Sequence, residues 1–199
     1  MPLSTYAELQ TYIAGDLNRS DLTTAIIDFI RMTETEMSER LKCREMDVRA
    51  TLTVTDGEAD IPAAMQSIRA MRLATTPFTR IVPEGLEALE GRDPAQSGGQ
   101  PTYALTAEKI VFWPVTSTTV RVTYRRDVPA LSTGVNWVLT EHPHLYIYGT
   151  LWQAHMYLKD DARASQYMNL FAGAITSLNE RDVVSQISGA QMSPNGPVV

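Results

Sequence analysis

The chain has 199 residues, 44% of them hydrophobic, and a formal net charge of −6. This length and composition allow one sizeable hydrophobic core and exclude a fibrous or wholly disordered protein. The acidic balance argues against a protein whose main role is to grip nucleic acid, because neutralising phosphates requires clustered Lys and Arg.

Two helices are predicted in residues 1–45. Thr5 and Glu8 form a capping-box pattern at the start of a short helix with one apolar face. Ser20 is the expected N-cap of a second helix of about 20 residues. The apolar stripe of this second helix contains Leu22, Ile26, Phe29, Ile30, Met37 and Leu41. Residues 1–45 are therefore expected to form an N-terminal helical hairpin.

A β-rich domain is predicted at 46–128. Apolar and polar residues alternate over Val48–Val54, the period of a half-buried strand, and Asp56-Gly57 follows as a hairpin signal. One or two helical turns are predicted at 84–90 and a loop at 91–101. Further strands are expected at 68–73, 78–82, 109–113 and 119–125. Together these segments predict a small antiparallel β domain.

Helical periodicity resumes at 129–182 and predicts a second helical hairpin. Pro143 is expected in the first turn of one helix, and Asp160 or Asp161 is expected to cap the next. Both hairpins expose an apolar face, and a four-helix bundle hides both faces. The predicted fold class is therefore α+β, with the β domain inserted between the hairpins. Residues 183–199 contain Ser188-Gly189 and two prolines and predict an extended C-terminal tail.

Catalytic signatures are missing from the sequence. No phosphate-binding glycine loop, nucleophile elbow or His-Glu-x-x-His helix occurs. His155 is interpreted as a core or interface residue, and the single cysteine, Cys43, as a small apolar residue. The glutamates of 84–90 indicate a solvated face, and the acids of 56–60 lack the ligand count of a calcium loop. No catalytic residue, cofactor or metal site is predicted.

Two strands deserve separate interpretations. Arg125 and Arg126 end a strand and are interpreted as cross-strand ion-pairing residues, because one strand is too little for a nucleic-acid platform. The strand 109–113 is apolar on both faces, so it is either central in a small sandwich or covered by another subunit. No secretion signal or membrane-spanning run is found, which predicts a soluble protein made in the cytosol.

Residues from both halves of the chain resemble the head-to-tail adaptor proteins of tailed bacteriophages. In the C-terminal half they are Trp137-Val138-Leu139, Pro143, Leu145-Tyr146, Leu151, Ala154, Tyr157-Leu158 and Asp160-Asp161. Upstream they are Gly99-Gln100-Pro101, Tyr103, Ile110, Trp113-Pro114, Tyr124 and Pro129-x-Leu131-Ser132. Their order and spacing carry the likeness, which spans nearly the whole chain. Gly149 departs from the pattern, since a better helix former is expected there.

The resemblance implies a structural, non-enzymatic virion protein at the head-tail interface. Implied partners are the portal protein, a downstream tail or nozzle protein, and further copies of the chain in a dodecameric ring. DNA would pass through the ring without sequence-specific binding, and no membrane or cofactor is implied. The residues predicted to contact the portal are Gln186, Ile187, Met192, Pro194, Pro197, Val198 and Val199. The residues predicted at a subunit or tail interface are Ile110, Phe112, Trp113 and Trp137.

Two other functions are compatible with the sequence. The first is another neck or tail-completion protein of a phage. The second is a small hydrolase or metal-dependent enzyme that assembles its site from His155 and scattered acids.

Overall fold

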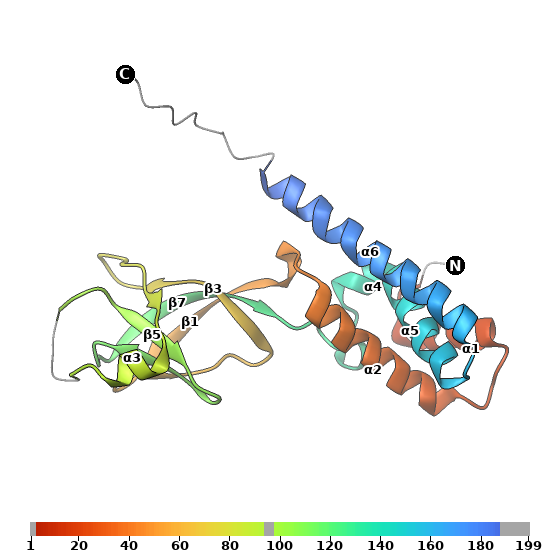
Figure 1. Cartoon of the computed structure of the whole chain (residues 1–199), viewed down its shortest axis with the longest axis horizontal. Coiled ribbons are helices and arrows are strands. Elements are labelled where there is room, and N and C mark those ends of the chain that lie inside the picture. Colours follow the sequence, from red (N-terminus) through yellow and green to blue (C-terminus); the bar gives the residue numbers. More distant parts are fainter. Residues whose placement is uncertain (1–2, 94–97, 188–199) are drawn as a thin grey trace, which may run out of the picture. The chain divides into compact units, whose positions relative to one another are not determined.

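The computed structural model describes residues 3–93 and 98–187, and in them it shows an α+β fold (Figure 1). The described residues separate into two compact units. A helical unit is drawn from Met1–Glu45 and Val128–Val199, and a β unit is drawn from Met46–Asp127. The helical unit is thus built from both ends of the chain, and the predicted α+β class is confirmed.

The first helix, α1 (Tyr6–Leu17), begins with the predicted capping box. The Thr5 hydroxyl accepts a hydrogen bond from the Glu8 backbone N–H, and the Glu8 carboxylate accepts one from the Thr5 N–H. These two bonds satisfy backbone donors that the first helical turn leaves without partners. The helix ends at Asn18, whose φ of 51° places it in the left-handed region that terminates helices.

The second helix, α2 (Thr23–Arg40), starts later than predicted. Its N-cap is Leu22, which makes no side-chain cap, so the prediction that Ser20 caps this helix is wrong. Leu22 is buried and its carbonyl accepts the first helical hydrogen bond, from Ile26. Packing of an apolar residue, and not a capping side chain, therefore sets this boundary.

The C-terminal part of the helical unit contains one helix that the sequence did not predict separately. A short 3-10 turn, Leu131–Thr133, leads to α4 (Trp137–Glu141), where the Asn136 side chain accepts a hydrogen bond from the Leu139 N–H at 3.0 Å. The next helix, α5 (Pro143–Tyr157), has proline in its first turn, as predicted. A proline N–H is not needed at that position, so α5 can start directly after α4.

The last helix, α6 (Asp161–Ile187), is longer than predicted. Asp160 caps its start by accepting a hydrogen bond from the Arg163 N–H at 3.2 Å. The sequence predicts an extended tail from residue 183, but the helix continues to Ile187. The added residues contain no proline or glycine, so nothing in them breaks a helix.

The core of the helical unit is centred on α5, which packs against α1, α2, α4 and α6. Its largest fully buried side chains include Leu9, Ile13, Ile26, Ile30, Met37, Leu139, Leu145, Tyr146 and Phe171. They come from both ends of the chain. The four-helix bundle remains a prediction.

The segment that re-enters the helical unit from the β unit is tied to α2 by polar bonds. The Val128 N–H donates to the Ser38 hydroxyl at 3.0 Å, and the Leu131 N–H donates to the Glu34 carboxylate at 2.7 Å. The Tyr146 hydroxyl donates to the same Glu34 oxygen at 3.2 Å. Glu34 is only 9% exposed, so one buried carboxylate joins three parts of the helical unit.

The first sheet of the β unit has the order β1-β7-β3 and is antiparallel. Its strands are β1 (Asp47–Val54), β7 (Thr118–Arg126) and β3 (Met65–Leu73). All three strands were predicted. The strand β7 lies in the middle, and its Val122 is opposite Ala50 of β1 on one side and Met71 of β3 on the other.

The second sheet has the order β2-β6-β5-β4. It contains β2 (Glu58–Asp60), β6 (Lys109–Trp113), β5 (Thr102–Leu105) and β4 (Val82–Pro83). The strand β6 was predicted and β5 was missed. In place of the strand predicted at 78–82 there is only the two-residue β4. It pairs with β5 in parallel, so the domain is not wholly antiparallel.

The Asp56-Gly57 turn forms, but it does not join a hairpin ladder. Both residues have positive φ, 51° and 79°, and Thr55 and Glu58 form a single bridge across them. Beyond that bridge β1 pairs with β7 and β2 pairs with β6. The Gly57 carbonyl accepts from the Phe112 N–H at 2.8 Å, so β6 captures the chain immediately after the turn.

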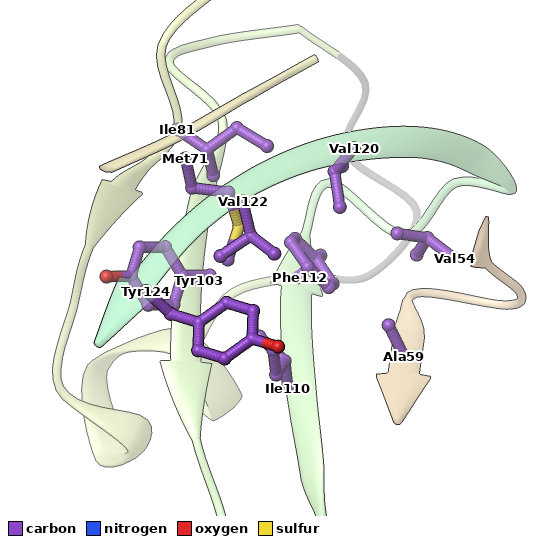
Figure 2. Close-up of a cluster of buried hydrophobic side chains, with 10 residues drawn as sticks. All are labelled: Val54, Ala59, Met71, Ile81, Tyr103, Ile110, Phe112, Val120, Val122 and Tyr124. Atoms are coloured by element: carbon purple, nitrogen blue, oxygen red, sulfur yellow. The ribbon is translucent and has the colours of Figure 1, made fainter. Parts of the chain in front are cut away.

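The core of the β unit receives side chains from both sheets, and Figure 2 shows them converging. It contains Val54, Ala59, Met71, Ile81, Tyr103, Ile110, Phe112, Val120, Val122 and Tyr124. A smaller cluster forms where α3 (Leu86–Glu90) places Leu89 against Ala104 and Trp113. The β unit therefore has a core of its own.

Candidate functional site

Side chains able to do chemistry are scattered through the described residues. No group of three or more His, Cys, Asp or Glu in residues 3–93 and 98–187 is placed to hold a metal ion. Cys43 is buried, and burial raises the pKa of its thiol to about 12, so it is not a thiolate at neutral pH.

His155 lies inside the helical unit. It is 3% exposed and stacks on the Tyr167 ring at a centroid distance of 5.4 Å. Its Nδ1 is 3.8 Å from the Asp160 carboxylate, beyond hydrogen-bond distance, and burial lowers the pKa of its imidazole. This environment is that of a neutral packing residue.

The residues predicted at a subunit or tail interface lie in different places. Ile110 and Phe112 are in the β-unit core, and Trp113 packs under Arg92, whose guanidinium lies 4.4 Å from the ring centroid. The chain itself covers these three side chains. Trp137 is half-buried in the helical unit and meets the His142 ring edge-on at 6.1 Å. Contact of these four residues with a neighbouring subunit or tail protein remains a prediction.

Of the residues predicted to contact the portal, Gln186 and Ile187 belong to α6. The others lie outside the described residues: Met192, Pro194, Pro197, Val198 and Val199. The part of α6 that leads toward them is the candidate functional site.

Near its end, α6 holds the backbone that leaves α2. The Asn179 side chain donates to the Arg40 carbonyl at 3.0 Å and accepts from the Lys42 N–H at 2.8 Å. One turn on, the Asp182 carboxylate accepts from the Arg44 N–H at 3.1 Å. A helix end leaves carbonyl groups without helical partners, and here a side chain of another helix supplies one. The name α2–α6 lock is used below for these contacts.

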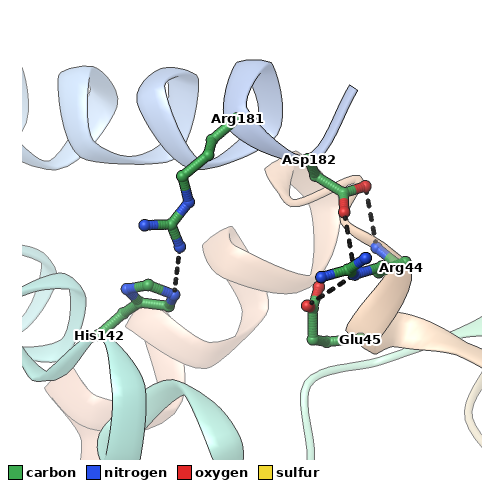
Figure 3. Close-up of polar contacts among 5 residues, drawn as sticks. All are labelled: Arg44, Glu45, His142, Arg181 and Asp182. Carbon is green, nitrogen blue, oxygen red and sulfur yellow. Dashed lines mark hydrogen bonds and ion pairs between the residues drawn. The ribbon is translucent and has the colours of Figure 1, made fainter. Parts of the chain in front are cut away.

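Charged side chains complete the lock (Figure 3). The Arg44 guanidinium lies 3.5 Å from the Asp182 carboxylate and 3.3 Å from that of Glu45. Asp182 is 6% exposed, so this pair is partly withdrawn from water. Breaking such a pair by removing one partner is costly because it leaves a charge without compensation.

A second polar contact of α6 lies beside the α2–α6 lock. The Arg181 guanidinium donates to the His142 Nε2 at 3.3 Å, which requires that nitrogen to be unprotonated. Burial and the Arg181 charge both lower the pKa of His142, so the neutral imidazole is favoured. Arg181 therefore lies against the start of α5, and Asp182 lies against the segment that follows α2.

The lock borders a hollow of about 270 Å³, lined by Arg44, Glu45, Glu141, Leu178, Arg181 and Asp182. Its charges are mixed, and it contains no nucleophile paired with a base. The next two residues of α6, Val183 and Val184, are 54% and 66% exposed. The site is therefore suited to holding a chain segment and presenting an apolar surface.

Sequence reasoning missed the lock. A signal was present, because Phe171, Ile175 and Leu178 continue at helical spacing to Asp182. A carboxylate on the apolar stripe of a helix indicates a buried partner. That the partner is Arg44 could not be read from the sequence, since 137 residues separate them.

A known protein family matches nearly the whole chain. A family model for the SU10 adaptor protein matches residues 4–196, which include both the helical unit and the β unit. None of the curated proteins matches the chain. Among the described helices, none is long and apolar enough to cross a membrane. The match confirms the resemblance to head-to-tail adaptors, and the chain belongs to the SU10 adaptor protein family.

Proposed function

We propose that the chain is a structural head-to-tail adaptor of a tailed bacteriophage. It forms a ring beneath the portal, extends the DNA channel and docks the tail. The observation that carries this proposal is the family match over residues 4–196. The mechanism is geometric: the chain closes a ring, seals the portal exit and offers a surface to the next component.

In this proposal the ring contains twelve subunits, as the resemblance implies. Neighbouring subunits close it through side-to-side contacts. Such contacts are heterologous, and a closing rotation makes the assembly finite. Exposed apolar side chains of the helical unit support this step, because a neighbour can cover them. They include Tyr12, Met32, Met156, Tyr157, Met168 and Leu170.

The segment after α6 makes the portal contact in this proposal. The α2–α6 lock supports it, because the lock anchors α6 within the helical unit only five residues before Ile187. Exposed Val183 and Val184 extend the apolar surface at this end of the helix. The β unit is the proposed contact for the tail or nozzle protein.

The location that follows from this role is the virion, at the head-tail interface, after synthesis in the host cytoplasm. Neither a cofactor nor an enzymatic activity is part of the proposal. An enzyme based on His155 is disfavoured by the 3% exposure of that side chain, which leaves it little access to a substrate.

Removal of residues 188–199 tests the portal contact. We expect the shortened chain to fold like the full chain and to lose co-purification with the portal. The cut is placed after Ile187 so that the α2–α6 lock, which includes Asp182, stays intact. Helical circular dichroism and portal pull-down are measured together.

The matched control is R163Q, a change of an exposed residue at the other end of α6, which should keep portal binding. Retained portal binding by the shortened chain would refute the assignment of this segment. A ring found at another level of the neck in a particle reconstruction would make the chain a different neck or tail-completion protein.

A further inference from the structure

Three arginines of the first sheet, Arg49, Arg72 and Arg121, lie close together on its outer face, and Arg80 lies next to them. Arg49 on β1 lies opposite Thr123 on β7, while Arg121 on β7 lies opposite both Thr51 on β1 and Arg72 on β3. Residues directly opposite one another in a sheet point to the same face. The intervening residues, such as Val120 and Val122, are in the core on the other face. Arg80 joins the group through a bridge to Arg72.

These four side chains are exposed. None of Arg49, Arg72, Arg80 and Arg121 forms an ion pair within 4.0 Å with any residue of the described ranges. The Asp47 carboxylate, two residues before Arg49 at the start of β1, is 3.6 Å from Arg69. Like charges placed opposite one another destabilise a sheet, so Arg121 beside Arg72 is a local cost that folding does not explain.

The arginines line one hollow of about 390 Å³ together with Ala70, Met71, Phe78 and Thr123. The Arg72 guanidinium lies over the Phe78 ring, 5.7 Å from its centroid, and this contact limits its freedom. We call this hollow and its four arginines the arginine face. Guanidinium groups and a threonine hydroxyl are donors that bind phosphate oxygens.

We propose that the arginine face binds the phosphate backbone of duplex DNA. A nucleic acid is favoured over a protein partner by what the face lacks. The centres of protein interfaces combine arginine with buried apolar and aromatic anchors, but here Met71 is 2% exposed and Phe78 is the one exposed aromatic side chain of the lining. Phosphate binding requires no apolar anchor.

The binding is sequence-independent and weak. The contacts are to phosphates, which carry no base information, and the net charge of −6 on the whole chain opposes association. A patch that touches DNA without retaining it suits a component past which DNA moves. The inference adds a binding site to the proposed function and does not depend on portal docking.

Fluorescence anisotropy of a labelled mixed-sequence duplex with the full chain tests the proposal. We expect salt-sensitive binding that the triple variant R49Q/R72Q/R121Q weakens about tenfold or more at low salt, with the slope of log K against log salt reduced by roughly 3. The matched control R19Q/R31Q/R163Q removes the same charge from ion-paired arginines of the helical unit and should bind like the wild type.

The single variant R121Q, with an expected slope reduction of about 1, keeps the test informative if the triple variant does not fold. Three outcomes would overturn the proposal: no duplex binding by the wild type at low salt, an equal loss in the control, or tighter binding of a poly-glutamate peptide than of DNA. The last outcome would identify an acidic protein segment as the occupant. Portal co-purification, measured alongside, separates this result from the proposed function.

Discussion

At the scale of single residues, Gly149 shows why a weak helix former stands in the middle of α5. A Cβ added there would lie 2.3 Å from the Thr33 side chain of α2 and 3.0 Å from the Phe171 ring of α6. Thr33 cannot move freely, because its hydroxyl donates to the Phe29 carbonyl at 2.9 Å. The glycine therefore lets three helices approach closely, and this outweighs its poor helix propensity.

The variant G149A is expected to destabilise the helical unit by about 1–3 kcal/mol, because the added methyl group overpacks the contact. Its control is G173A in α6, where an added Cβ would meet nothing within 4 Å. G173A should stabilise the protein by about 0.5–1 kcal/mol, since alanine favours the helix. Urea unfolding measures both, and equal effects of the two substitutions would contradict the packing argument.

At the scale of elements, Glu34 joins α2 to the segment that returns from the β unit. Burial raises the pKa of its carboxyl above the ordinary value of 4.5, although the Leu131 N–H and the Tyr146 hydroxyl act in the opposite direction. The folded chain therefore binds this proton more tightly than the unfolded chain. The contribution of Glu34 to stability is fully present below pH 4.5 and is lost as the pH rises through the raised pKa.

The variant E34Q stays neutral in both states while its amide oxygen can still accept both hydrogen bonds. We expect its free energy of unfolding, relative to the wild type, to increase from about pH 4 to pH 7. Chemical unfolding at a series of pH values measures this difference. E39Q, at an exposed position of the same helix, serves as the control. A parallel pH dependence of E34Q and the wild type would show that Glu34 is not responsible.

At the scale of the whole molecule, the β unit is an insertion whose two ends meet. Asp47 on β1 lies opposite Arg125 on β7, so the chain enters and leaves the unit on neighbouring strands. The two units also have separate cores. This arrangement allows a domain to be inserted into a fold without disturbing the packing around it.

Replacing residues 46–127 by a short Gly-Ser linker should therefore leave a helical unit that unfolds cooperatively. The linker needs only a few residues, because paired antiparallel strands are about 5 Å apart between Cα atoms. Circular dichroism during thermal unfolding measures the outcome, with the isolated 46–127 fragment tested in parallel. Loss of cooperative unfolding in the linked helical chain would indicate that the units depend on each other.

The sequence alone determined the features that depend on neighbouring residues. The alternation over Val48–Val54, the Thr5–Glu8 capping box and proline at the start of α5 all reflect local spacing and local hydrogen bonding, and all were predicted. The family resemblance also depended on order along the chain, and the match over residues 4–196 confirmed it.

Only the tertiary structure decided which distant segments meet. It paired β1 with β7 in place of β2, joined Asp182 to Arg44, and gathered the arginine face from separate strands. The Asp56-Gly57 turn shows the limit well: its local conformation was predicted, but β6 determined where the chain went next. The physical reason is that such pairings depend on the competition among all strands and helices for burial and for hydrogen-bond partners, which local spacing does not record.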